Sequence, residues 1–332
     1  MSELAPIIIM TGTGTAIGKT VTTAAIVVVL RAQGLRLVVV KPTQTGLLPG
    51  EPGDLHDVCR LAGDVETYEF VRLPDPLAPD AAGRLAGVEL LTVADHAARL
   101  AEIAGRDDID LVLVEGAGGL LVRIDADAAT IADLGAELKA VGAKVGYIVV
   151  TAAGLGTLNH SALTAEALRS RGLDCLGFVI GSWPDNPDLA TRTNLQDLAS
   201  VTGAQLLGRV PACAGRMDPA AFQANAAGWI TITCPGRRTL RPALRSCTIL
   251  RFTNWSRGTA ACSRDEAEND QLGGHQDREQ IRRIIDRRRV QFAYRGQHRR
   301  PAACLGQPTQ HDSFGATSVA GQHVQSPGRD IG

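Results

Sequence analysis

The chain has 332 residues, 21% of them charged, and a formal net charge of −1 at pH 7. This length can bury a sizeable core, and no window approaches the roughly 18 uncharged apolar residues of a membrane span. The N-terminus lacks a basic region followed by a long apolar run, and the 7 cysteines include no CxxC pair. These features argue against a signal peptide, disulfides and zinc, and favour a cytoplasmic protein.

The charge is distributed unevenly along the chain. Residues 1–230 carry 17 Lys and Arg against 26 Asp and Glu, whereas residues 231–332 carry 17 Arg, no Lys and 9 Asp and Glu. The second segment has no sustained hydrophobic periodicity and cannot bury enough apolar surface to offset its ordering entropy. We therefore predict a folded domain over 1–230 and an Arg-rich, disordered or irregular extension over 231–332.

Two interpretations of this extension remain open. An arginine-rich arm could bind nucleic acid, but no aromatic platform or known module accompanies the arginines. The alternative is an accidental extension, because the composition changes abruptly after Trp229-Ile230, as where a reading frame is lost near the end of a domain. We favour the second, expect neither nucleic acid nor membrane as a partner, and expect residues from about 235 onward to be dispensable.

Residues 1–230 alternate apolar strands with helices. The predicted strands, in chain order, are Pro6–Thr11, Leu37–Lys41, Asp110–Glu115, Val145–Thr151 and Leu176–Ile180. The predicted helices are Thr20–Gln33, Thr92–Ala104, Thr130–Ala140, Leu158–Arg171 and one near Pro219–Trp229. This alternation indicates an α/β fold with a mostly parallel sheet and helices on both faces. Ligands of such sheets bind beyond the carboxyl ends of the strands, so we expect the chemistry there.

A glycine-rich loop follows the first strand, with the sequence GTGTAIGKT over Gly12–Thr20. Its glycines allow backbone N–H groups to face an anionic oxygen cluster, and the following helix start adds partial positive charge. Lys19 can reach the β- and γ-phosphates of a nucleotide, and the Thr20 hydroxyl can bind Mg²⁺. The first glycine lies one residue earlier than in the common pattern, where this chain has Thr13. The loop predicts a fold of P-loop NTPase type, and a glycine-rich turn without a ligand is the alternative.

Charged residues also mark two further strand ends and a helix start. Lys41 ends the second strand and is expected to point into the crevice of the phosphate loop, although alone it would be read as a surface lysine. Glu115 ends the third strand and could hold Mg²⁺ against a triphosphate, with an N-cap or a loop acid as the alternative. Asp54 opens a helix, and its chemistry alone favours a helix N-cap.

Several segments together resemble the dethiobiotin synthetases over residues 6–230. They are Gly12–Thr20, Lys41–Gly46 (KPTQTG), Asp54, Glu115–Gly119 (EGAGG) and Leu155–His160 (LGTLNH). The resemblance implies a homodimeric, ATP-dependent cyclo-ligase of biotin biosynthesis that uses 7,8-diaminopelargonate and CO₂ or bicarbonate. One amine would take up CO₂ as a carbamate, the carbamate would attack the γ-phosphoryl group, and the second amine would close the ureido ring and expel phosphate.

The same resemblance implies roles for individual residues. Lys41 and Lys19 would be catalytic, because an anionic carbamate that attacks an anionic phosphate needs cations around it. Thr20, Asp54 and Glu115 would bind Mg²⁺. Thr45 would contact the diamine or its carbamate, and Gly156, Thr157, Leu158 and Asn159 of the neighbouring subunit would bind the substrate carboxylate. The nucleotide would contact Ala16, Ile17, Gly18, Lys19, Thr20, Val21, Asp54, Glu115, Gly116, Ala117, Gly118, Gly181, Ser182, Pro211, Ala212 and Cys213.

The sequence departs from the family pattern at the expected base site. Many members have Asn-Asp after the strand that ends here at Ile180, whereas this chain has Gly181-Ser182. We therefore expect weak discrimination between ATP and other nucleoside triphosphates. The main alternative is a ParA/MinD-like partitioning ATPase, but such loops usually carry a lysine near their start, where this chain has Thr13-Gly14-Thr15.

Overall fold

The computed structural model describes residues 6–232 of the chain. All but the first two residues of the predicted Arg-rich extension lie outside this range, so its irregular structure and its dispensability stay predictions. Within the range, Cys59, Cys175 and Cys213 form no disulfide. None of the helices between residues 6 and 232 has the length and hydropathy of a bilayer span.

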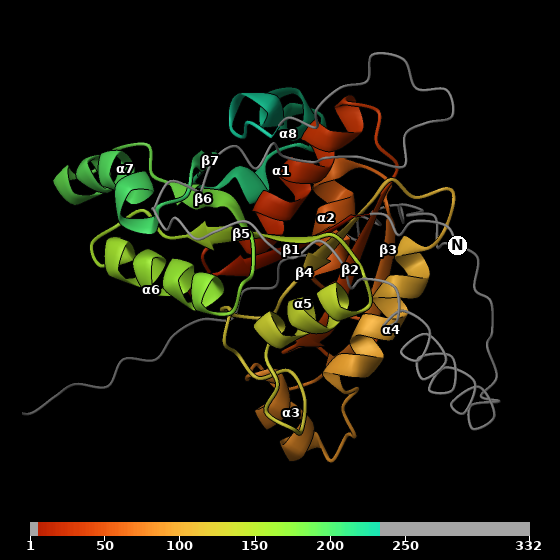
Figure 1. Cartoon of the computed structure of the whole chain (residues 1–332). Coiled ribbons are helices and arrows are strands. Elements are labelled where there is room, and N and C mark those ends of the chain that lie inside the picture. The colour runs from red at the N-terminus through yellow and green to blue at the C-terminus, as the bar shows by residue number, and fades with distance from the viewer. Residues whose placement is uncertain (1–5, 233–332) are drawn as a thin grey trace, which may run out of the picture. The chain divides into compact units, whose positions relative to one another are not determined.

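A seven-stranded sheet forms the centre of the described domain, with the strand order β3-β2-β4-β1-β5-β6-β7 (Figure 1). All of its strand pairs are parallel. The strands are β1 Ile7–Gly12, β2 Leu37–Thr45, β3 Glu66–Leu73, β4 Leu111–Glu115, β5 Val145–Thr151, β6 Cys175–Trp183 and β7 Leu206–Pro211. The parallel sheet predicted from the sequence is confirmed, and β3 and β7 are two edge strands that the prediction missed.

Helices cover both faces of the sheet, as predicted. They are α1 Lys19–Ala32, α2 Asp54–Ala62, α3 Pro79–Ala86, α4 Val93–Ala104, α5 Ile131–Ala140, α6 Thr157–Ser170, α7 Leu189–Thr202 and α8 Pro219–Asn225. One apolar core joins α4, α5, α6 and α7 to one face, and a second joins α1, α2 and α8 to the other. Alternate residues of β1 supply the two cores: Ile7 and Ile9 enter the first, and Ile8 and Met10 enter the second. Figure 1 shows the two helix groups on opposite sides of the sheet.

One buried histidine lies in the first of these cores. His96 on α4 is fully buried, and within residues 6–232 neither of its ring nitrogens has a hydrogen-bond partner. Its ring stacks on Phe70, with the ring centroids 5.9 Å apart. Burial lowers the pKa of His96 to about 4, the charge of Arg99 acts in the same direction, and Asp125 and Asp95 oppose it. His96 is therefore neutral in the folded protein at neutral pH.

We expect His96 to make the domain less stable in acid. Its pKa in the unfolded chain is about 6.5, so only the unfolded chain readily takes up the proton as the pH falls below that value. The stability associated with neutral His96 is complete above pH 6.5, and about 3 kcal/mol of it is lost between pH 6.5 and 4. Urea unfolding of His96→Leu should show a smaller loss over this window than the wild type. His160→Leu, at an exposed helical histidine, is the control, and equal slopes for all three proteins would contradict the expectation.

Candidate active site

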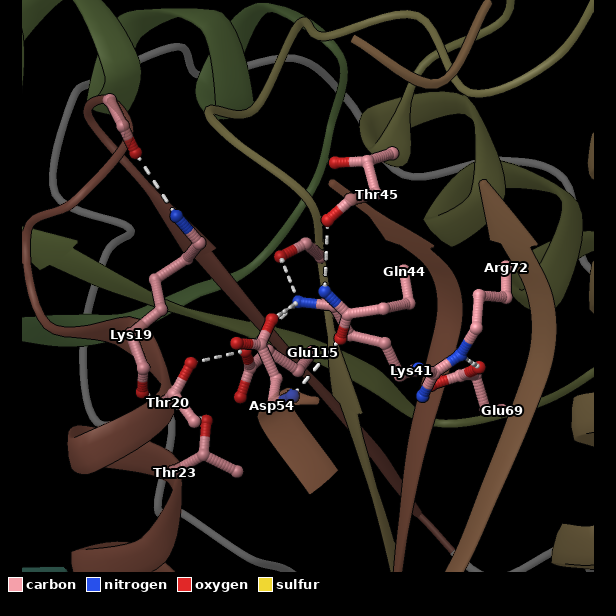
Figure 2. Close-up of polar contacts among 12 residues, drawn as sticks. Lys19, Thr20, Thr23, Lys41, Gln44, Thr45, Asp54, Glu69, Arg72 and Glu115 are labelled. Atoms are coloured by element: carbon pink, nitrogen blue, oxygen red, sulfur yellow. Dashed lines mark hydrogen bonds and ion pairs between the residues drawn. The ribbon is translucent and has the colours of Figure 1, made fainter. Parts of the chain in front are cut away.

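Four polar side chains meet beside the starts of α1 and α2 (Figure 2). Glu115 is the last residue of β4, but β2 continues to Thr45, so the prediction that Lys41 ends its strand is wrong and Lys41 lies in the middle of β2. The Lys41 Nζ atom lies 2.5 Å from Asp54 Oδ2 and 3.0 Å from Glu115 Oε1. The Thr20 hydroxyl donates to the same Glu115 oxygen at 2.9 Å. The structure thus brings Lys41 together with the three oxygen ligands that the family resemblance assigns to a metal.

The electrostatics of this cluster favour the charged forms of Lys41 and Asp54. Burial disfavours the charged form of Lys41, but the carboxylates of Glu115 and Asp54 outweigh burial and raise the pKa of Lys41. Burial likewise works against the Asp54 carboxylate, yet the charge and the hydrogen bond of Lys41 hold the pKa of Asp54 below its usual value. Burial, followed by repulsion from Lys41, lowers the pKa of Lys19. The positive charge of Lys41 is therefore close enough to affect the pKa of Lys19.

Two of the alternatives left open by the sequence are wrong. Lys41 is no surface residue, because only 3% of it is exposed. Asp54 is no N-cap, because Gly53 occupies that position and Asp54 is the first residue of α2. Its backbone N–H donates to Gln44 Oε1 at 3.0 Å, and the Gln44 amide donates to the carbonyl of Thr45. Gln44, which sequence reasoning missed, ties the helix that carries Asp54 to the end of β2 (Figure 2).

The phosphate loop connects β1 to α1, as predicted. The Lys19 ammonium group donates to the carbonyl of Gly14 at 3.1 Å, so the side chain folds back over the loop. Gly18 has φ +90°, and a Cβ atom there would lie 2.2 Å from the carbonyl oxygen of Gly181 at the end of β6. A Cβ atom on Gly181 would in turn lie 2.1 Å from the carbonyl oxygen of Ile17. The two glycines allow β6 to pack directly against the loop backbone.

The segments expected around the nucleotide base come together at the ends of β6 and β7. Trp183 pairs with Pro211, and the N–H of Ala212 donates to the Trp183 carbonyl at 2.6 Å. The guanidinium of Arg209 lies 4.6 Å from the centre of the Trp183 ring, a cation–π arrangement. Cys213 is exposed with φ +63°. Sequence reasoning missed the pair of Trp183 and Arg209, because it becomes visible only once β7 is placed beside β6.

The segment expected to bind the substrate carboxylate lies beyond the carboxyl end of β5. Gly156, with φ +92°, is the N-cap of α6, so Thr157, Leu158 and Asn159 form the first helical turn. Leu155, directly before the cap, is 93% exposed. The N–H groups of a first helical turn lack intrahelical partners and can bind an anion, and the expected role of this segment stays a prediction.

The strand order and the loop that carries Lys19 and Thr20 define a P-loop nucleotide-binding domain of the α/β class. A family profile described as an AAA domain matches residues 7–219. The ATP-dependent dethiobiotin synthetase BioD of Rhodococcus jostii is 51% identical over 227 residues, which cover 68% of this chain and 95% of that protein. The BioD protein of Streptomyces coelicolor is 52% identical over 228 residues, covering 68% and 92%. The chain belongs to the dethiobiotin synthetase family.

Similarity to solved structures is more distant. The MinC:MinD cell division protein complex of Aquifex aeolicus has a TM-score of 0.40 at 14% sequence identity, and the match covers 67% of this chain and 86% of that chain. A similarity at this level carries no functional argument, so it gives no support to the partitioning ATPase alternative.

Proposed function

We propose that this member of the dethiobiotin synthetase family closes the ureido ring of dethiobiotin from 7,8-diaminopelargonate, CO₂ and ATP. The observation that carries the proposal is the buried ammonium group of Lys41, which lies beside the phosphate loop and close to Lys19. The reaction brings an anionic carbamate against an anionic γ-phosphate. Two fixed cations at that meeting point would stabilise the charge that develops there.

The residues of the site suit phosphoryl transfer by positioning and charge. Lys19, which donates to a loop carbonyl, can turn its N–H groups to phosphate oxygens. Lys41, in the middle of β2, lies on the neighbouring side of the cluster and would neutralise the carbamate. Thr45, four residues further along β2, would contact the diamine. None of these tasks requires a histidine as general base.

Mg²⁺ fits the donor set of Thr20, Asp54 and Glu115. Both carboxylates and the hydroxyl present oxygen, the ligand that Mg²⁺ prefers. Glu115 Oε2 is buried, and within residues 6–232 it has no hydrogen-bond partner, a cost that a bound cation would offset. Mg²⁺ usually takes only one or two carboxylates from the protein, and phosphate and water oxygens would complete the shell here. The ion would supply positive charge to the β- and γ-phosphates.

The remaining part of the proposal concerns the substrate carboxylate. The N–H groups of residues 156–159 would bind it, and they would reach the site from the second subunit of a homodimer. Leu155, directly before this segment, is 93% exposed and would contact the second subunit there.

One assay tests the proposed reaction. Phosphate release should require Mg-ATP, bicarbonate and diaminopelargonate together, and omission of any one should reduce it to background. Formation of dethiobiotin, followed by mass spectrometry, should match the phosphate released. Full phosphate release without diaminopelargonate would instead indicate an ATPase, and would contradict the proposed ligase reaction.

We also expect weak selectivity for the nucleotide base. Gly181 offers no side chain to hydrogen-bond a base edge, and Ser182 beside it is exposed. A site with a full hydrogen-bonding set can discriminate by ~10⁴-fold, whereas a site without one cannot. In competition against a fluorescent ATP analogue, the dissociation constants of CTP, GTP and UTP should therefore differ from that of ATP by much less than this ~10⁴-fold factor. Binding of ATP alone would contradict this expectation.

A further inference from the structure

A network of buried hydroxyl groups lies behind the loop between β5 and α6. Thr151, the last residue of β5, is fully buried. Its Oγ1 atom lies 2.7 Å from the hydroxyl of Thr157, 2.8 Å from that of Ser161 and 3.3 Å from that of Thr13. One side chain thus joins the phosphate loop, which contains Thr13, to the first two turns of α6.

The direction of each hydrogen bond in this network can be deduced. The single hydroxyl proton of Thr157 goes to the carbonyl of Ala152, which can only accept. Thr151 must therefore donate to Thr157, and it accepts from both Ser161 and Thr13. A hydroxyl group has one proton and two lone pairs, so Thr151 uses its full capacity.

Asn194 on α7 holds the same loop from a second side. Its amide nitrogen donates to the carbonyl of Ala153 at 2.9 Å and to that of Gly154 at 2.8 Å. Only 6% of Asn194 is exposed. Together with the bond from Thr157 to Ala152, three successive carbonyls of the loop are bound by side chains. The path of the chain into the N-cap of α6 is therefore set by side chains.

We propose that Thr151 and Asn194 are positioning residues that hold the start of α6 in the orientation required to bind the substrate carboxylate. This inference rests on the proposed function, which gives the N–H groups of residues 156–159 that role. The phosphate loop depends less on the network, because the N–H of Thr13 also donates to the carbonyl of Val150 at 3.0 Å. Loss of the network should therefore affect the substrate more than the nucleotide.

Thr151→Val tests the inference with little change in volume. A methyl carbon needs about 3.5 Å from an oxygen atom, so it cannot occupy the place of a hydroxyl that lies 2.7 and 2.8 Å from two oxygens. The start of α6 must shift, and displacements of this size cost ~10-fold or more in a positioned site. We expect the KM for diaminopelargonate to rise by about that factor, while kcat and the KM for ATP change much less. Thr151→Ser, which keeps the hydroxyl, should have a KM for diaminopelargonate close to that of the wild type.

A second variant and a matched control separate positioning from general loss of stability. Asn194→Asp keeps the shape but places a carboxylate against two carbonyl oxygens, so it should also raise the KM for diaminopelargonate. Thr202→Val removes another buried hydroxyl, at the far end of α7, and should lower Tm without changing this KM. The inference would be overturned if Thr151→Val left the KM for diaminopelargonate unchanged, or if Thr202→Val raised this KM by the same factor. It would also be overturned if Thr151→Ser raised the KM as much as Thr151→Val does.

Amide hydrogen exchange tests the positioning role of Thr151 without relying on the proposed ligase reaction. In Thr151→Val, amides of residues 152–160 should exchange ~10-fold faster than in the wild type, with no change around α2, because the anchored loop opens more often. Unchanged exchange would count against the positioning role even in an active enzyme. Absence of dethiobiotin formation by the wild type would count against the proposed function alone.

Discussion

Replacement of Lys41 with alanine is expected to lower the rate of phosphate release ~10²-fold or more, the scale of losing one electrostatic donor at a reacting centre. Nucleotide affinity should stay close to that of the wild type, because the phosphate loop and Lys19 remain. The buried carboxylate of Glu115 and the partly exposed carboxylate of Asp54 would then lose the cation that they share. Tm should consequently fall as well.

Three further variants make the Lys41 result specific. Lys41→Met keeps most of the side-chain length without the charge and should lose turnover as Lys41→Ala does. Lys19→Ala should weaken nucleotide binding and turnover together. Lys139→Ala, at a surface ion pair with Asp174, should change neither. Single-turnover phosphate release and nucleotide titration measure both quantities. Turnover of Lys41→Ala at the wild-type rate would show that the carbamate does not bind beside this lysine.

Gly181→Asn is expected to weaken the binding of every nucleotide instead of improving selectivity for ATP. The family resemblance puts Asn at this position in many members, and the substitution would add a side chain able to hydrogen-bond a base edge. In this chain, however, the Cβ atom would lie 2.1 Å from the Ile17 carbonyl oxygen and 2.5 Å from Val150 Cγ1. The phosphate loop would have to move, and overpacking of this kind costs roughly 1–3 kcal/mol, which corresponds to a roughly 5- to 150-fold loss of affinity.

Ser182→Asn is the matched control for this variant. It introduces the same side chain one residue later, at an exposed position where no movement of the loop is required. Its affinity for ATP should remain near that of the wild type. Titration of both variants with ATP and CTP would decide the matter. Tighter binding of ATP by Gly181→Asn, with CTP weakened, would mean that the strand end has room for a base-reading side chain.

The central strands of the sheet could be predicted from the sequence, whereas the edge strands and helix α7 could not. The strands β1, β2, β4, β5 and β6 consist largely of apolar residues because helices cover both of their faces. The edge strand β3 is mostly half-buried, and charged residues at Glu66, Glu69 and Arg72 interrupt its apolar residues, so it gives no such run. Helix α7 buries Thr191, Asn194 and Thr202 beside a single leucine, Leu198, and therefore lacks the apolar stripe that reveals a helix.

The candidate site likewise contains residues that the sequence predicted and contacts that it did not. The residues of local motifs, such as Lys19, Thr20 and Glu115, could be found because their spacing encodes their chemistry. Contacts between distant segments could not, since they depend on which strands become neighbours. The packing of Gly181 on the phosphate loop joins residues far apart in sequence, and so does the contact of Asn194 with the loop before α6. Both features depend on the placement of β6 and α7 relative to the first half of the chain.

The position of β1 in the sheet has a consequence for folding. This strand precedes the other six, yet its pairing partners within residues 6–232 are β4 and β5, through register partners such as Ile7 with Val112 and with Val145. Closing such long loops costs entropy before any contact rewards it, which slows folding. During synthesis, β1 has no partner strand until β4 has been made. Its run of three isoleucines and a methionine stays unpaired for that period, which exposes the nascent domain to aggregation at its own central strand.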